Sequence, residues 1–308
     1  MKRIFDLIIF KVITIWVQIR DIYLYFFRHA IIINAYVDDH TWKGIHHRNW
    51  GDDLNYYFIK LLTGRPVITF HNFRLARLFY FKNYLCIGTL LDGTGYKNKS
   101  TIVWGAGASG EERCMNHPKN ICSVRGPLTQ KYVLSQILSC SNIYGDPALL
   151  LSCFYKPAIS FKQYRLGIIP HVVDLNSPVL ENVKKTYGDA VLIINLQDYN
   201  KWTDVIDEVC SCQMIASSSL HGLIISDAYN VPNAWIELSG NISGGYFKFR
   251  DYGSSVGHIL ENPLRIVSVD NVNMIDNICK DWKPIKVDVD AILSVCPFNI
   301  KKHRIYNG

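Results

Sequence analysis

The first candidate for proton-transfer chemistry is His221, in the segment Ser217–Pro232. The run Gln213–Ser217 predicts a strand and Gly222–Tyr229 predicts a helix, so the imidazole falls at the turn between them. The free N–H groups of a helix start stabilise negative charge and lower the pKa of a nearby histidine, whereas a bound anion raises it. A lone histidine is more often structural than catalytic. Its position in a polar strand-to-helix turn favours a role in proton transfer.

A second polar turn, Asn49–Asn55, opens a helix that apolar spacing predicts over Asp52–Leu62. Gly51 permits a tight turn, and the free N–H groups of the helix can bind an anion or a sugar hydroxyl. Asp52 can act as a general base or accept a hydrogen bond from a sugar hydroxyl. The local pattern alone favours a simpler role, in which Asp52 or Asp53 caps the helix.

One arginine lies where an anion could bind. Arg125 separates a predicted strand, Asn120–Val124, from a predicted helix, Pro127–Ile137. A guanidinium can clamp a carboxylate or phosphate through two parallel hydrogen bonds. A solvated surface charge is an equally good interpretation of a lone arginine. Asp146, in a Gly-Asp-Pro turn at a strand end, either forms only that turn or orients Arg125.

Two further segments carry glycine or cationic side chains. Trp104–Gly110 contains G-x-G-x-x-G beginning at Gly105, but the following residues do not predict the helix that a dinucleotide site needs. We interpret this loop as one that allows close backbone approach to a ligand. In the stretch 244–252, Lys248 and Arg250 alternate with aromatic residues, a pattern typical of an edge strand with a cationic face.

The elements that must position these residues alternate strand and helix along the chain. Other predicted strands are Ile31–Val37, Tyr84–Gly88, Ile102–Gly105, Leu166–Pro170, Ala190–Ile194 and Ala234–Glu237, and Lys201–Ser211 is a further predicted helix. Such alternation predicts α/β architecture with two doubly wound domains facing a cleft at the carboxyl ends of the strands. We expect an N-terminal helix over 1–29 and domains over 30–157 and 158–308.

Composition narrows the class of protein. The 308 residues are 49% apolar and 19% charged, which predicts a folded chain with a sizeable core. The net charge of +7 suits an acidic ligand or an anionic membrane surface, and no basic run interleaved with aromatics indicates nucleic-acid binding. Nine scattered cysteines are typical of reduced thiols in a cytoplasmic protein, and their spacing does not indicate a metal site.

The N-terminal segment is apolar but interrupted. Asp6 and Lys11 break the run Phe5–Val17, so it lacks the clean apolar region of a signal peptide and the length of a membrane span. Two interpretations carry equal weight. This helix lies in a membrane interface, at the cytoplasmic face, or it packs on the protein or on a partner chain.

Together, the motifs resemble the polysaccharide pyruvyl transferase family, and the stretch 248–252 is similar to its exopolysaccharide-biosynthesis subgroup. The resemblance covers about Asn49 to Asp251 and rests on the order of the motifs: N-x-G-D, W-G-x-G, S-V-R-G-P, G-D-P and S-x-x-L-H-G. It implies two Rossmann-like domains similar to those of B-type glycosyltransferases. It also implies transfer of the pyruvyl group of phosphoenolpyruvate to two hydroxyls of a glycan or lipid-linked oligosaccharide, giving a cyclic ketal and phosphate without cofactor or metal.

The resemblance also assigns roles. His221 would protonate the methylene carbon of phosphoenolpyruvate or assist phosphate departure, and Asp52 would accept a proton from, or orient, an acceptor hydroxyl. Many family members have Arg two residues before the histidine, where this chain has Ser219. The expected donor-binding residues are Arg125, Ser219, Lys248, Arg250 and Gly105, and the residues expected to position them or to bind the acceptor are Asp146, Asn49, Asn55 and Ser218.

Two other functions remain open at the level of sequence. One is a sugar-nucleotide glycosyltransferase on the same architecture, which would release a nucleotide instead of phosphate. The other is a non-catalytic glycan-binding protein, in which Ser219 would mark a lost donor site.

Overall fold

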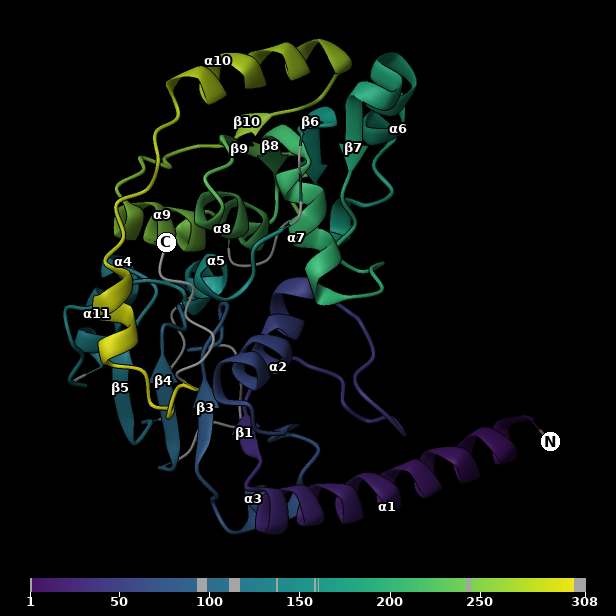
Figure 1. Ribbon diagram of the computed structural model, residues 1–308, viewed down its shortest axis with the longest axis vertical. Coiled ribbons are helices and arrows are strands. Elements are labelled where there is room, and N and C mark those ends of the chain that lie inside the picture. The colour runs from purple at the N-terminus through teal and green to yellow at the C-terminus, as the bar shows by residue number, and fades with distance from the viewer. Residues whose placement is uncertain are drawn as a thin grey trace.

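The computed structural model describes residues 2–92, 99–110, 117–136, 138–157, 159, 161–241 and 245–301. Over these residues the architecture is α/β with two five-stranded sheets, and every strand pairing in both is parallel (Figure 1). The strand orders are β2-β1-β3-β4-β5 and β10-β9-β8-β6-β7. The predicted α/β class with two parallel sheets is confirmed.

The first sheet consists of short, mostly buried strands: β1 (Ile31–Ile33), β2 (Val67–Thr69), β3 (Asn83–Leu85), β4 (Thr101–Trp104) and β5 (Asn120–Ser123). Apolar residues on both faces are typical of parallel strands covered on both sides. The strand predicted over Ile31–Val37 ends at Ile33, where the chain leaves the sheet. Sequence periodicity missed β2, because three residues are too few to establish a period.

The second sheet contains β6 (Tyr164–Ile169), β7 (Val191–Ile193), β8 (Cys212–Ser217), β9 (Asn233–Glu237) and β10 (Leu264–Arg265). All four strands expected here are present, with ends within two residues of the prediction. The two-residue edge strand β10 was not expected.

The expected helices also form: α2 (Trp50–Thr63), α4 (Pro127–Ser135), α7 (Trp202–Cys210) and α8 (Leu220–Ala228). Shorter or unpredicted helical segments are α3 (Arg74–Leu78), α5 (Leu151–Phe154), α6 (Pro178–Tyr187), α10 (Asn273–Asp281), α11 (Val289–Ser294) and the 3-10 turns η1 (Pro147–Leu150), η2 (Val172–Asp174), η3 (Gly188–Ala190) and η4 (Val269–Val272).

One prediction about secondary structure is wrong. The stretch with alternating cations and aromatics forms a helix, α9 (Phe247–Val256), and not an edge strand. Its buried residues include Lys248, Phe249, Tyr252 and Val256, which follow helical spacing. Gly257 ends the helix in the left-handed region, at φ +81°. The short alternation at its start was compatible with both periods, and packing against α4 decides for the helix.

Contacts between the two sheet units are polar as well as apolar. The Trp50 indole donates to the carbonyl of Trp202 at 2.8 Å, and the Tyr199 hydroxyl donates to the Asp53 carboxylate at 2.6 Å. The C-terminal segment after α10 returns to the first unit, where the Trp104 indole donates to the carbonyl of Ile292 at 3.1 Å. The first two of these contacts hold α2 against the second unit. The domain boundaries stay a prediction.

The N-terminal helix α1 (Lys2–Arg28) runs along the base of the first unit and extends beyond it (Figure 1). Among the described helices, none combines the length and apolar character needed to cross a membrane. Eight cysteines lie in the described part of the chain and all are free thiols, while Cys114 lies outside it.

Candidate functional site

His221 occupies the first turn of α8, directly after a compact serine turn at the end of β8. The backbone N–H of Ser219 donates to the Ser217 hydroxyl at 3.0 Å, which fixes that turn. A Cβ on Gly222 would lie 2.2 Å from the same hydroxyl oxygen, so only glycine lets the helix start so close to the strand. This local geometry directs His221 toward the first unit.

The imidazole of His221 packs directly on α2. A Cβ on Gly51 would lie only 1.9 Å from His221 Nδ1, so glycine at this position makes room for the ring. A Cβ added at Gly88 would lie 3.7 Å from both His221 Nε2 and Asp52 Oδ1. His221 and Asp52 come from different sheet units and meet at one glycine. His221 Nε2 is buried and has no hydrogen-bond partner among the described residues.

Burial and neighbouring charges strongly shift the pKa values of His221 and Asp52. Burial, reinforced by the positive charges of Lys248, Arg125 and His171, lowers the pKa of His221 to about 3. Burial and the neighbouring Asp53 raise the pKa of Asp52 to about 7, against the opposing effect of Lys248. Without a ligand, His221 is therefore neutral near pH 7, and Asp52 titrates close to it. Such perturbed pairs are typical of functional sites.

Of the two expected cations on α9, one reaches this site. Lys248 is buried, and burial together with Arg125 lowers its pKa to about 8, while Asp52 acts in the opposite direction. Arg250 points elsewhere and donates to the carbonyl of Glu261 through Nε and Nη2, at 3.0 and 2.8 Å. The two residues are separated because α9 is helical, which places positions two apart on different faces.

Arg125 is fully buried in a network that the protein itself supplies. Its Nε donates to Asp251 at 2.9 Å, Nη1 to the Thr89 hydroxyl at 2.8 Å and Nη2 to the Ala108 carbonyl at 2.8 Å. Asp251 also accepts from the backbone N–H of Thr129 at 2.8 Å and its hydroxyl at 2.6 Å. The charge of Arg125 is thus compensated by Asp251, and its field still acts on His221.

Asp146 forms no hydrogen bond with Arg125 in the described part of the chain, so a role in orienting Arg125 stays a prediction. Its carboxylate accepts from the backbone N–H groups of Ala148, at 2.9 Å, and Gly88, at 3.3 Å. Burial raises the pKa of Asp146 to about 6. Asp146 therefore holds the Gly88 turn on which His221 and Asp52 converge. Gly105 packs on the turn that carries Asp146, because a Cβ there would lie 2.3 Å from Pro147 Cδ.

The two asparagines predicted at α2 have positioning contacts. Asn49, and not Asp52 or Asp53, is the N-cap residue and accepts from the N–H of Gly51 at 3.1 Å. Asp52 is therefore not needed as a cap, contrary to the simpler interpretation of the sequence. Asn55 is buried and exchanges two hydrogen bonds of 2.9 Å with the backbone of Ile87, which ties α2 to the turn after β3.

The expected serines also lie at the site. Ser218 is buried, accepts from the backbone N–H of His171 at 2.8 Å and contacts Asp174 Oδ2 at 3.1 Å. Ser219 is the buried N-cap residue of α8, and its side chain makes no capping bond. Ser218 thus holds the backbone at His171, directly after β6.

Sequence reasoning missed His171, which follows β6 and faces the same group of cations. Burial and the charge of Lys248 lower its pKa to about 4, against the opposing effect of Asp174. Its position directly after the predicted strand Leu166–Pro170 was the available signal, because ligands of parallel sheets bind at the carboxyl ends of strands.

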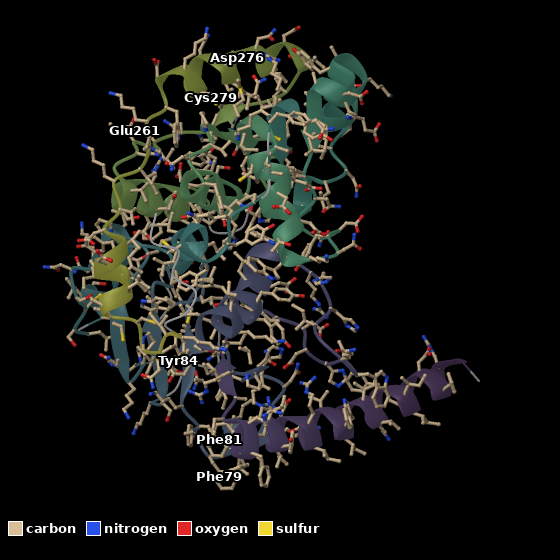
Figure 2. The ribbon with its side chains drawn as sticks, viewed as in Figure 1. Phe79, Phe81, Tyr84, Glu261, Asp276 and Cys279 are labelled. Carbon is tan, nitrogen blue, oxygen red and sulfur yellow. The ribbon has the colours of Figure 1, made fainter. Side chains whose placement is uncertain are left out.

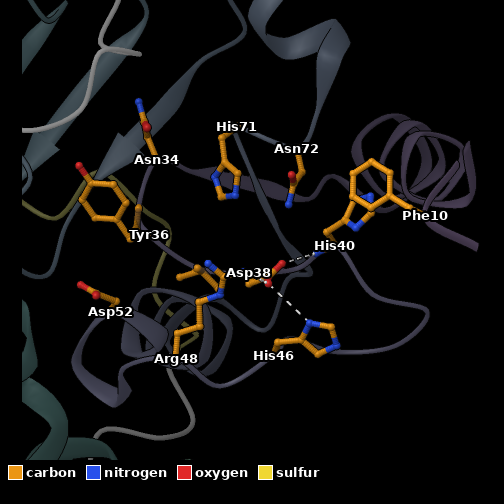
Figure 3. Close-up of a pocket in the computed structure, with 12 residues that line it drawn as sticks. Phe10, Asn34, Tyr36, Asp38, His40, His46, Arg48, Asp52, His71 and Asn72 are labelled. Atoms are coloured by element: carbon orange, nitrogen blue, oxygen red, sulfur yellow. Dashed lines mark hydrogen bonds and ion pairs between the residues drawn. The ribbon is translucent and has the colours of Figure 1, made fainter. Parts of the chain in front are cut away.

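A cavity of about 750 Å³ adjoins Asp52 on the side of the first unit (Figure 3). Its walls come mainly from the segments after β1 and β2 and include Phe10, Asn34, Ala35, Tyr36, Val37, Asp38, His40, His46, Arg48, Asp52, His71 and Asn72. The Asp38 carboxylate lies 2.6 Å from Arg48 Nη2 and 3.5 Å from His46 Nδ1. Within the described residues, no three His, Cys, Asp or Glu side chains are grouped for a metal ion. The sequence patterns did not predict this cavity. The polar residues that follow Ile33 were the feature that could have indicated it.

Comparison with known proteins identifies a matching family and two relatives. The model of the family described as polysaccharide pyruvyl transferase matches residues 19–240. An uncharacterised protein of Acanthamoeba polyphaga mimivirus is 27% identical over 79% of this chain and 83% of its own length. The succinoglycan biosynthesis protein ExoV of Rhizobium meliloti (strain 1021) is 28% identical over 71% of this chain and 65% of its own length. No solved structure matches significantly.

The family match includes every element that builds the His221–Asp52 site except α9, from the Asn49 cap of α2 to the serine turn before α8. The similarity to a succinoglycan biosynthesis protein agrees with the exopolysaccharide subgroup that the motifs indicated. The chain is therefore a transferase that belongs to the polysaccharide pyruvyl transferase family.

Proposed function

We propose that this protein transfers the pyruvyl group of phosphoenolpyruvate to two hydroxyls of a sugar in a polysaccharide or lipid-linked oligosaccharide, forming a cyclic ketal and releasing phosphate. The observation that carries the proposal is the meeting of His221 and Asp52 at Gly88, with Lys248 acting electrostatically on both. The family supplies the reaction class, and the site supplies two proton-transfer groups with a buried cation.

Lys248 is proposed as the main group that binds the donor's negative charge. Arg125 is engaged with Asp251, and Arg250 points away from the site. Ser219 stands where many family members have an arginine, and Lys248 supplies a buried cation beside the same helix start. The N-terminus of α8 adds the partial positive charge of its free N–H groups.

The proton steps follow from the shifted pKa values. Lys248 and Arg125 contribute to the depression of the His221 pKa, so a bound anionic donor would oppose them and raise it. His221 would then carry the proton that is added to the methylene carbon, as C2 becomes electrophilic. Asp52 would take the proton of the first attacking hydroxyl. The second hydroxyl displaces phosphate at C2, and its proton leaves with the phosphate.

The cavity beside Asp52 is proposed as the acceptor site. About 750 Å³ lies within the usual range of pockets for organic ligands, which is roughly 300–1,000 Å³. Asn34, Asp38 and Asn72 provide hydrogen-bonding groups of the kind that bind sugar hydroxyls, and Tyr36 adds an aromatic ring. Asp52 lines the same cavity, where it could reach an acceptor hydroxyl (Figure 3).

The test is a turnover assay with phosphoenolpyruvate and a panel of glycans and lipid-linked oligosaccharides, read out by phosphate release and by the mass of the ketal. We expect His221→Ala to lower kcat by about 10²–10⁴-fold, the usual contribution of general acid–base catalysis. His117→Ala, which changes an exposed histidine, is the matched control. Release of a nucleotide from a sugar nucleotide, without consumption of phosphoenolpyruvate, would instead assign a glycosyltransferase.

A further inference from the structure

The helix α1 exposes large apolar side chains over most of its length. Phe5 is 63% exposed, Phe10 58%, Ile15 61%, Ile19 58% and Phe27 71%. Leu7, Ile8, Ile9, Val12, Trp16, Tyr23 and Phe26 are exposed as well. The N-terminal half extends past the first unit, as Figure 1 shows, and its exposed charged residues are Arg3, Asp6 and Lys11. Soluble proteins rarely expose so large a contiguous apolar surface, so another surface is expected to cover it.

A second element extends this surface at the other end of the helix. In and after α3, Leu78, Phe79 and Tyr80 are each more than 60% exposed. Phe79 stacks on Phe81 with ring centroids 6.2 Å apart, and Phe81 stacks on Tyr25 of α1 at 4.7 Å. Figure 2 shows Phe79 and Phe81 beside the C-terminal end of α1. We call the exposed residues of α1 together with Leu78, Phe79 and Tyr80 the α1–α3 surface.

The charges around the α1–α3 surface are mostly positive. The exposed cations on these elements and their flanks are Arg3, Lys11, Arg28, Arg74, Arg77 and Lys82. Asp6 is the one exposed acidic residue of α1, since Asp21 is buried against Arg20 at 2.8 Å. Cations and aromatic residues bordering an apolar face are typical of helices that lie in an anionic lipid interface.

We propose that the α1–α3 surface docks the protein on a membrane surface of anionic phospholipids, with α1 lying in the plane of the interface. A second copy of the chain fits this surface less well, because two positively charged surfaces would face each other. The helix does not meet the requirements for crossing a membrane, which leaves the interfacial orientation.

The attachment of α1 to the protein body makes this docking directional. Gln18 donates to the carbonyl of Asn72 at 2.6 Å, and Arg20 reaches the Asp39 carboxylate at 3.2 Å. Nearer the N-terminus, Phe10 packs on His40 with ring centroids 4.7 Å apart, and both residues line the cavity that contains Asp52. Docking would therefore hold the cavity next to the lipid surface. The docking itself does not depend on the proposed reaction.

The experiment is co-sedimentation of the full chain with vesicles of phosphatidylcholine, with or without about one third phosphatidylglycerol, a composition that provides anionic charge. We expect binding to the anionic vesicles that weakens with added salt, because salt screens headgroup attraction. The variant Ile15→Ser/Phe27→Ser/Phe79→Ser should partition onto the vesicles about tenfold or more weakly, because it removes apolar area that docking would bury in the lipid. Ile259→Ser/Val267→Ser changes residues that are 87% and 72% exposed outside this surface and is the matched control.

Three results would overturn the proposal: no binding of the wild-type chain to anionic vesicles, equal binding by the triple and control variants, or a dimer that the triple variant dissociates while vesicles are not bound. The last would assign the surface to a second copy. Circular dichroism checks that each variant is folded. Equal affinity of the triple variant and the wild type for phosphoenolpyruvate separates a failure of docking from a failure of the proposed function.

Discussion

Two of the contacts between the sheet units differ in how their polar groups are paired. In the contact between α4 and α9, each nitrogen of Arg125 has an acceptor, and Asp251 is bound by Arg125 and Thr129. In the contact between α2 and α8, His221 Nε2 is buried and has no hydrogen-bond partner in the described part of the chain, and Asp52 has a strongly raised pKa.

The difference separates structural from reactive polar groups. A buried ion pair with satisfied hydrogen bonds helps to specify how the units pack, and removing one partner is costly. A buried polar atom without a partner costs free energy that a ligand can recover on binding. We therefore expect substitutions in the first contact to act mainly on stability and those in the second mainly on turnover.

The largest effect is expected for Arg125→Met, which leaves the buried Asp251 carboxylate without its cation. The free energy of unfolding should fall by about 3–5 kcal/mol, the usual cost of breaking a buried pair. Denaturant unfolding monitored by circular dichroism measures it. Arg125→Met/Asp251→Asn should recover part of the loss, because the second change removes the unpaired charge. A single variant as stable as the wild type would show that this contact is not structural.

Gly51→Ala tests the other contact by moving His221 without changing it. The added methyl carbon would lie 1.9 Å from His221 Nδ1, so the imidazole must shift. Displacement of a catalytic group by about 1 Å can cost about 10²-fold, and we expect a fall in kcat of that order. Phosphate release from phosphoenolpyruvate measures it, with the melting temperature as the control for folding. Unchanged kcat would argue that the position of His221 does not matter for turnover.

The raised pKa of Asp52 predicts a pH-dependent stability. A carboxyl group whose pKa rises from 3.8 unfolded to about 7 folded binds more protons in the folded state between these values. Its contribution to stability is therefore present below pH 4 and is lost as the pH rises through 7. Asp52→Asn should be more stable than the wild type at pH 8, by a few kcal/mol at most, and the difference should shrink toward pH 4. Parallel pH profiles of unfolding for both proteins would contradict the assignment.

The smallest effect is expected for Lys248→Met, which keeps the length of the side chain and removes its charge. The affinity for phosphoenolpyruvate should fall by about tenfold, as for the loss of one charge-assisted contact. Titration calorimetry measures it without an acceptor. Arg250→Met, in which the lost charge lies at an exposed position that faces away from the site, should bind the donor normally. Equal losses in the two variants would mean that general surface charge, and not Lys248, attracts the donor.

The amino-acid sequence by itself determined the elements and the turns that carry the chemistry. Apolar runs at strand spacing predicted most strands, because a parallel strand covered on both faces must be apolar throughout. His221 and the turn that carries Asp52 were found because polar residues interrupt these patterns at a strand end and a helix start. The order of the motifs indicated the family that the comparison identifies.

Only the tertiary structure decided which of these residues act together. Arg125 pairs with Asp251, which is 126 positions away, instead of Asp146, and Lys248 is selected over Arg250 because the segment is helical. The pKa values of His221 and Asp52 likewise depend on burial by segments distant in sequence. Periodicity is a local property of the chain, whereas desolvation and charge pairing depend on what packs against each side chain.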